Sequence, residues 1–123
     1  MKSKIQSIVC VLVICAFAPM ALAHAFLDHS DPPVGSTLAA APKDVKIWFT
    51  RALEGALSSI TVNSEDGTEV DKQDSHLDDK DQTLMIVSLK DLGPGKYKVH
   101  WHAVCTDTHL TEGSFEFTIK PQG

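Results

Sequence analysis

The sequence predicts an all-β domain, a sandwich of two sheets with about seven short strands. Apolar and polar residues alternate with a period of two in several stretches, which is the pattern of a strand with one buried face. Turns rich in glycine and proline separate these stretches, and no stretch keeps a helical apolar period for three turns. Short strands between such turns are typical of β-sandwiches.

Six stretches show the strand pattern: residues 25–29, 45–50, 58–63, 83–89, 96–103 and 114–119. In the clearest one the apolar set has a single parity: Tyr97, Val99, Trp101 and Ala103. Residues 83–89 are apolar on both faces, which predicts a central strand. Tyr97 follows Pro94-Gly95 and enters a strand, so we expect it to make the tyrosine-corner hydrogen bond of such sandwiches.

Turns and loops occupy the segments between these strands. Residues 31–35 and 39–42 contain prolines that break the chain, and Glu65-Asp66-Gly67 predicts a hairpin-type turn. The stretch 71–82 is strongly charged, so we expect a solvated loop there.

The first 23 residues have the pattern of a cleavable secretory signal peptide. Lys2 and Lys4 precede an apolar run at 5–18, and Ala21-Leu22-Ala23 has the small-x-small form of a cleavage site. The run is shorter than the roughly 20 apolar residues of a membrane-spanning helix. We therefore expect residues 1–23 to be removed and residues 24–123 to form one exported, periplasmic domain that does not insert into the membrane.

Processing changes both the charge and the cysteine count of the chain. Loss of Lys2 and Lys4 lowers the 11 basic residues to 9 against 16 acidic ones, so the net charge falls from −5 to −7. A chain this acidic offers no electrostatic footprint for nucleic acid, and it suits cations better. Only Cys105 remains after cleavage, which excludes an internal disulfide.

Cleavage after Ala23 would make His24 the first residue of the mature chain. A histidine at a free N-terminus offers two nitrogens, the α-amine and the ring, which close a small chelate ring on a metal. Such a pair suits the tetragonal N/O geometry of Cu(II) or Ni(II). Histidine at this boundary can also arise by chance, so His24 alone does not decide the matter.

Asp107-Thr108-His109 adds a carboxylate and an imidazole two residues apart. The two side chains can point the same way if the backbone is extended. Polar residues are also ordinary in loops, and the pair alone is compatible with a plain turn. His24, Asp107 and His109 together predict three nitrogens and one oxygen around a metal.

The chain resembles the CopC family of periplasmic copper-binding proteins over nearly all of residues 24–123. The resemblance begins with His24 directly after the signal and continues through Ser30-x-Pro32-x-x-Gly35-Ser36 and the strand at 45–53. It includes Gly95-Lys96-Tyr97-Lys98-Val99-His100-Trp101, and Val104-Cys105-Thr106-Asp107-Thr108-His109 followed by Gly113-Ser114-Phe115. Leader cleavage before a histidine combined with Asp-x-His at this place is the specific part.

The resemblance implies a cupredoxin-like or Ig-like Greek-key sandwich. It also implies one Cu(II) per chain, bound by the amine and ring of His24, by Asp107 and by His109, an arrangement called a histidine brace. The implied role is to carry or buffer copper in homeostasis or resistance, without catalysis. Copper is the implied partner, and an inner-membrane copper transporter is a candidate second one.

The chain departs from the family pattern in three places. Arg51 stands where some members have a glutamate ligand, and Glu54 lies three residues further on. The loop at 71–82 has no methionine, and His76 is its one conventional transition-metal ligand apart from carboxylates, so a Cu(I) site there is not expected. Cys105 stands where the family often has serine, and its parity predicts a small buried residue, with a thiol near copper as the alternative.

Other histidines leave further possibilities open. His100 and His102 lie on the polar face of one expected strand, where they are solvated residues or a weak metal site, and His102 could instead support the brace as an outer partner. Two rival functions also remain: a histidine-brace copper oxygenase, or an Ig-like interaction module without a true metal site. An oxygenase needs an open coordination position and a flat aromatic surface, whereas aromatics make up only 7% of this chain and Asp107 would fill a position.

Overall fold

The computed structural model describes residues 27–122, and His24 therefore lies outside the described residues. Eight strands and one short 3-10 helix follow one another along this part of the chain: β1 Leu27–Asp31, β2 Thr37–Leu38, β3 Asp44–Phe49, η1 Gly55–Leu57, β4 Ser59–Ser64, β5 His76–Leu77, β6 Leu84–Ser88, β7 Gly95–Val104 and β8 Leu110–Ile119. Within residues 27–122 no helix has the length and apolar character that a membrane crossing requires.

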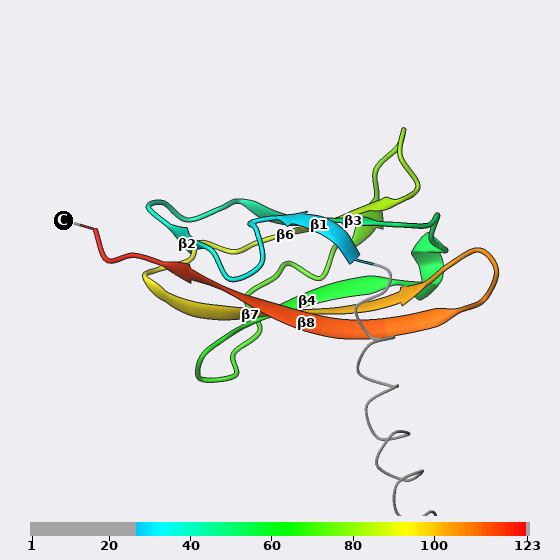
Figure 1. The fold of residues 1–123 in the computed structure, drawn as a ribbon. Helices are drawn as coiled ribbons and strands as arrows, with labels where there is room; N and C mark the ends of the chain where they lie inside the picture. The colour runs from blue at the N-terminus through cyan, green and yellow to red at the C-terminus, as the bar shows by residue number, and fades with distance from the viewer. Residues whose placement is uncertain (1–26, 123) are drawn as a thin grey trace, which may run out of the picture.

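The strands form two four-stranded sheets that stack face to face (Figure 1). One sheet has the order β1-β3-β6-β5 and the other has the order β2-β8-β7-β4. All the neighbouring strands are antiparallel except β2, which runs parallel to β8. The predicted all-β sandwich is confirmed, and β6 is a central strand as expected.

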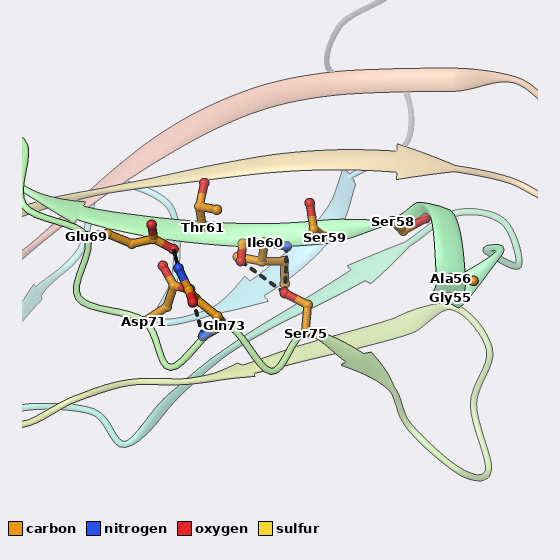
Figure 2. A pocket seen from close by; sticks show the side chains of 10 residues that line it. All are labelled: Gly55, Ala56, Ser58, Ser59, Ile60, Thr61, Glu69, Asp71, Gln73 and Ser75. Atoms are coloured by element: carbon orange, nitrogen blue, oxygen red, sulfur yellow. Dashed lines mark hydrogen bonds between the residues drawn. The ribbon is translucent and has the colours of Figure 1, made fainter.

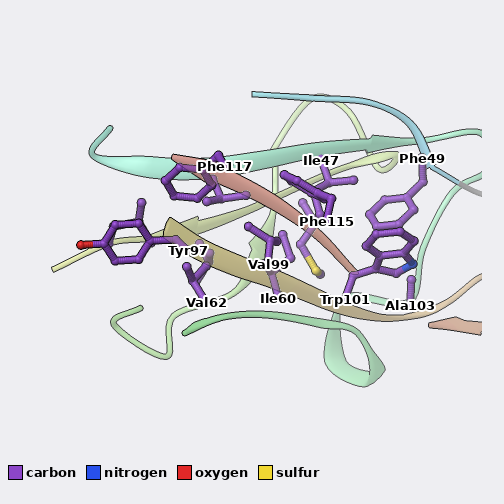
Figure 3. Packing of buried hydrophobic residues seen from close by; sticks show 14 of the residues in the cluster. Ile47, Phe49, Ile60, Val62, Tyr97, Val99, Trp101, Ala103, Phe115 and Phe117 are labelled. Carbon is purple, nitrogen blue, oxygen red and sulfur yellow. The ribbon is translucent and has the colours of Figure 1, made fainter. Parts of the chain in front are cut away.

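The core lies between the sheets and follows the period-two alternation read from the sequence. Every second residue of β7 is buried, from Tyr97 through Ala103. Trp101 packs edge-on against Phe49 at one end of the core, and Tyr97 stacks on Phe117 at the other (Figure 3). The Tyr97 hydroxyl donates a 2.8 Å hydrogen bond to the carbonyl oxygen of Gly93, so the predicted tyrosine corner is confirmed.

Two sequence-based expectations differ from the structure. The described residues form eight strands, where about seven were expected. The sequence pattern does not reveal β2 and β5, because a strand of two residues is too short to show an alternation. The stretch 71–82 is not wholly a solvated loop, since it contains β5 and the side chain of Asp71 is buried. The Asp71 carboxylate accepts hydrogen bonds from the backbone N–H groups of Val62 and Gln73, which explains how a charged residue is held inside.

This segment covers the outer edge of β4, the last strand of its sheet. Ser75 accepts a hydrogen bond from the Ile60 N–H and donates one to the Ile60 carbonyl, as Figure 2 shows. Side chains thus occupy backbone groups that an edge strand would otherwise expose, which blocks pairing with another chain. The hollow between this segment and β4 is therefore a structural feature of the fold (Figure 2).

Candidate metal site

The turn between β7 and β8 lies at the end of the sandwich opposite the C-terminus (Figure 1). Two hydrogen bonds close it: the Cys105 N–H donates to the His109 carbonyl at 2.9 Å, and the Thr108 N–H donates to the Cys105 carbonyl at 2.8 Å. Thr108 has a φ of 73°, a left-handed conformation that is unusual for a β-branched residue. Asp107 and His109 are thus brought together by a tight turn, and not by the extended backbone expected from their spacing.

The segment that follows β3 also supports this turn. The Thr106 N–H donates to the Ala52 carbonyl at 3.1 Å, and the Glu54 N–H donates to the Val104 carbonyl at 2.8 Å. Leu53 and Cys105 also form an isolated β-bridge. The backbone that carries Asp107 and His109 is therefore held by hydrogen bonds within the turn and by hydrogen bonds to the segment after β3.

Three side chains of the kinds that can hold a metal ion converge at this turn. One ligand atom from each of Cys105, Asp107 and His109 lies within 4.8 Å of the others, and among residues 27–122 this is the one cluster of three or more such groups. The imidazole Nδ1 of His109 is 3.2 Å from Oδ2 of Asp107. Asp107 and His109 are exposed, whereas Cys105 is buried, so the cluster reaches from the core to the surface.

Both oxygens of the Asp107 carboxylate accept hydrogen bonds. Oδ1 accepts from the Cys105 thiol at 2.8 Å and from the His109 N–H at 3.3 Å. Oδ2 accepts from the guanidinium of Arg51 at 3.0 Å. These donors orient the carboxylate before any metal arrives.

The pKa values of two groups in the cluster are displaced in opposite directions. Hydrogen bonds from the Cys105 thiol and from His109 lower the pKa of Asp107 well below its usual range, so this residue stays a carboxylate in mild acid. Burial raises the pKa of the Cys105 thiol, and the neighbouring Asp107 carboxylate raises it further. Without a metal, the cluster therefore combines a carboxylate with a protonated thiol.

Arg51 is the residue of this region that sequence reasoning missed. In the sequence, Arg51 stands where some family members have a glutamate ligand, and an arginine cannot bind a metal. The structure shows that its side chain reaches Asp107. Arginine in place of an acidic ligand was the available signal, because a cation there is expected to meet a neighbouring carboxylate.

The other candidate residues lie apart from the cluster. His29 stacks on Trp48 with 4.4 Å between ring centroids. His76 is on β5, where its Nδ1 lies 2.8 Å from the Asp74 carbonyl oxygen. Glu54 precedes η1 and donates through its backbone, as described above; its side chain is exposed and is not a member of the cluster.

His100 and His102 have the outward-facing positions on β7 that their parity predicted. Nδ1 of His102 is 2.7 Å from a carboxylate oxygen of Glu112 on the neighbouring strand. Neither histidine belongs to the cluster at the β7–β8 turn. The contact with Glu112 supports the interpretation of His102 as a partner of the neighbouring strand.

The fold and this cluster define a class of molecule: a small two-sheet sandwich with metal-binding donors gathered in a turn at one end. The family model described as the CopC domain matches residues 27–120. The chain therefore belongs to the CopC family, as its resemblance predicted.

Individual relatives agree with this assignment. Protein YobA of Escherichia coli K12 is 31% identical over 111 residues, covering 89% of this chain and 90% of that protein. Copper resistance protein C of Xanthomonas campestris pv. juglandis is 30% identical over 119 residues, covering 88% and 92%. The crystal structure of CopC from Methylosinus trichosporium OB3b superimposes with a TM-score of 0.75 at 30% identity, covering 81% of this chain and 97% of that one.

Proposed function

We propose that this chain is exported, cleaved after Ala23, and then binds one Cu(II) through His24, Asp107 and His109. The mature protein, residues 24–123, carries or buffers copper in the periplasm for copper homeostasis or resistance. The observation that carries the proposal is the convergence of Asp107 and His109 on an exposed turn in a member of the CopC family. Copper in the printed name of a relative, copper resistance protein C, adds support.

The position of β1 is compatible with a contribution from His24. Leu27 pairs with Phe49 at the end of β3, and Arg51, two residues beyond Phe49, contacts Asp107. Three residues of extended chain span at most about 10 Å. A terminal histidine three residues before Leu27 would therefore stay within about 10 Å of Leu27.

The donor set suits Cu(II). An amine nitrogen, two imidazole nitrogens and a carboxylate oxygen match the tetragonal N/O geometry that this ion prefers. The net charge of −7 expected after cleavage favours a cation. In this proposal Asp107 occupies a coordination position that an oxygenase would leave open, which favours a copper carrier or buffer over an oxygenase. An inner-membrane copper transporter is the candidate partner.

The proposal is tested on exported, processed protein. Intact mass spectrometry should show the loss of residues 1–23, and titration should show one Cu(II) per chain with a tetragonal electron paramagnetic resonance spectrum. His24→Ala, Asp107→Ala and His109→Ala should each weaken Cu(II) binding more than about tenfold, since even an outer partner of a ligand is worth that much.

His76→Ala is the matched control, because His76 lies on β5 and outside the cluster. Its Cu(II) affinity should equal that of the unchanged protein. Equal damage from His76→Ala and His109→Ala would show that the site is elsewhere. A chain that begins one residue before or after His24 would remove the terminal chelate from the proposal.

A further inference from the structure

The turn that presents Asp107 and His109 also presents a sulfur atom from its inner side. The Cys105 Sγ lies 2.8 Å from Oδ1 of Asp107 and 3.3 Å from the carbonyl oxygen of His109. Its distance to a ligand atom of His109 is within 4.8 Å. The thiol is thus part of the same cluster as the two residues proposed to bind Cu(II).

Among the described residues, Cys105 provides the only sulfur donor at this turn. Residues 27–122 contain one other sulfur-bearing residue, Met85, which is fully buried between the sheets. Soft thiolate and thioether donors select Cu(I), whereas amine, imidazole and carboxylate donors suit Cu(II). The sulfur in the turn is therefore a donor of a different kind from those assigned to the Cu(II) site.

We propose that Cys105 and His109 form a Cu(I)-binding pair that shares His109 with the proposed Cu(II) site, so that one end of the sandwich holds copper in either oxidation state. The sharing rests on the function proposed above, but the Cu(I) pair itself requires neither His24 nor cleavage of the signal. On binding, the Cys105 S–H bond breaks, the sulfur bonds to Cu(I) and the proton leaves to solvent; no electron is transferred.

The geometry of the turn is close to what such a pair needs. Bonds of about 2.3 Å to sulfur and about 2.0 Å to nitrogen, as found for zinc, place two opposed donors about 4.3 Å apart. The Cys105 sulfur and a ring nitrogen of His109 lie within 4.8 Å of each other, and the His109 side chain is exposed and can adjust this separation. The backbone hydrogen bond from Cys105 N–H to the His109 carbonyl keeps the two residues at this spacing.

The position of the sulfur also determines how it can be reached. Cys105 is 1% exposed and the His109 side chain is 71% exposed, so the sulfur is buried while the imidazole faces water. Copper arriving from solvent therefore meets the imidazole first and the thiol second. The burial of the sulfur also keeps it away from a second chain, which disfavours an intermolecular disulfide.

The experiment uses the processed chain under anaerobic conditions, with Cu(I) supplied as its bicinchoninate complex. The unchanged protein should remove Cu(I) from the chelator, and X-ray absorption should show copper–sulfur scattering. Cys105→Ser is the informative variant because the serine hydroxyl can still donate to Asp107 and fill nearly the same volume. We expect it to lose about 100-fold in Cu(I) affinity, the upper end of the loss caused by disturbing a metal site, and to lose the sulfur scattering.

Further variants separate this proposal from a folding defect and from the proposed Cu(II) function. His109→Ala should weaken both oxidation states, while His102→Ala, outside the cluster, should weaken neither. Cys105→Ser should keep its melting temperature and should lose far more Cu(I) affinity than Cu(II) affinity, because its hydroxyl can still donate to Asp107 but supplies no sulfur. Cys105→Ala is a second thiol-free variant. Equal Cu(I) affinity with and without the thiol, or absent sulfur scattering, would overturn the pair whatever the Cu(II) titrations show.

Discussion

The guanidinium of Arg51 donates a 3.0 Å hydrogen bond to Oδ2 of Asp107, a residue 56 positions away in the sequence. Both side chains are about half exposed, at 53% and 49%. Water and salt screen such a pair, so it contributes little to the stability of the fold. Its effect should instead be on the metal, because it places a fixed positive charge beside a carboxylate that we propose as a Cu(II) ligand.

Arg51→Gln should therefore raise Cu(II) affinity. Removing one charge from the neighbourhood of a divalent ion lowers the repulsion by about 1–2 kcal/mol in a medium like water, which corresponds to about a tenfold gain at low ionic strength. The Cys105 thiol and the His109 N–H still orient the Asp107 carboxylate. Cu(II) titration in low and high salt measures the effect, which should shrink as salt is added.

Arg51→Lys is the matched control for this charge effect, because it keeps the cation and changes the geometry of its donors. Its Cu(II) affinity should stay near that of the unchanged protein. A loss of affinity in Arg51→Gln, with Arg51→Lys unaffected, would show that a cation at this position is needed to hold Asp107 in place and that orientation outweighs repulsion.

Gly113→Ala should destabilise the fold. Gly113 pairs with Trp101 across β7 and β8, and a methyl group on Gly113 would lie 2.3 Å from Cζ2 of the Trp101 ring. The indole is buried, so it cannot move aside without displacing its neighbours. Overpacking of this kind typically costs about 1–3 kcal/mol, which urea denaturation of the copper-free protein would detect.

Gly93→Ala serves as the comparison for Gly113→Ala. Gly93 is exposed, and an added methyl group there meets no atom within 4 Å. Its unfolding free energy should stay within about 0.5 kcal/mol of the unchanged protein, as for most surface substitutions. Equal stability of the two alanine variants would mean that the Trp101 ring has room the structure does not show.

The stability of the domain should decrease in acid, in part through Asp74. Hydrogen bonds from Ser88, through its hydroxyl and its backbone N–H, lower the pKa of Asp74 below its usual value of 3.8. The unfolded chain then binds a proton more readily than the folded one, so this contribution is present above about pH 4 and is lost as the pH falls through the folded pKa. Urea denaturation between pH 7 and pH 2.5 would follow the loss.

Asp74→Asn tests this assignment because the amide oxygen can accept the same hydrogen bond but does not titrate. Its unfolding free energy should depend less steeply on pH in the acid range. Asp79→Asn, which lies on the other side of β5 and is also exposed, is the comparison. An acid profile that is the same in both variants would assign the pH dependence to other carboxylates.

Sequence reasoning identified the sandwich because its signal is local. The alternation in β7 depends on neighbouring residues alone, and the structure buries the predicted face. The start of β8 was missed for a physical reason: Gly113 occupies an inward position without an apolar side chain, because the Trp101 ring fills the space above it. Asp71 was misjudged because a charged residue is usually exposed, and its hydrogen bond from the Val62 N–H forms only when the segment folds against β4.

The candidate site was predictable in its residues and not in its contacts. Asp107 and His109 were identified by type and spacing, and the structure gathers both with Cys105. Their arrangement depends on the left-handed backbone at Thr108 and on Arg51, which comes from a distant part of the chain. Neither feature follows from local pattern, since one is an unfavourable conformation and the other is a long-range contact.

The most discriminating prediction concerns the terminal amine itself. A processed protein with one extra glycine before His24 keeps the His24 ring, Asp107 and His109, and loses only the primary amine next to that ring. A peptide nitrogen takes its place and must shed a far less acidic proton before it can bind a metal. Cu(II) affinity should therefore fall by more than about tenfold, the least that disturbing a metal site costs, as measured by competition with a chelator of known affinity.

The melting temperature of the copper-free protein provides the control for this extension. A chain terminus contributes little to a core, and the described core begins only at β1. Melting without copper should thus be nearly unchanged, while the added stability from Cu(II) should shrink, because the stabilisation by a ligand grows with the logarithm of its affinity. Cu(I) binding at Cys105 and His109 should not respond, since that pair does not use the amine. Unaltered Cu(II) affinity in the extended protein would exclude the brace and direct attention to His100 and His102 on β7.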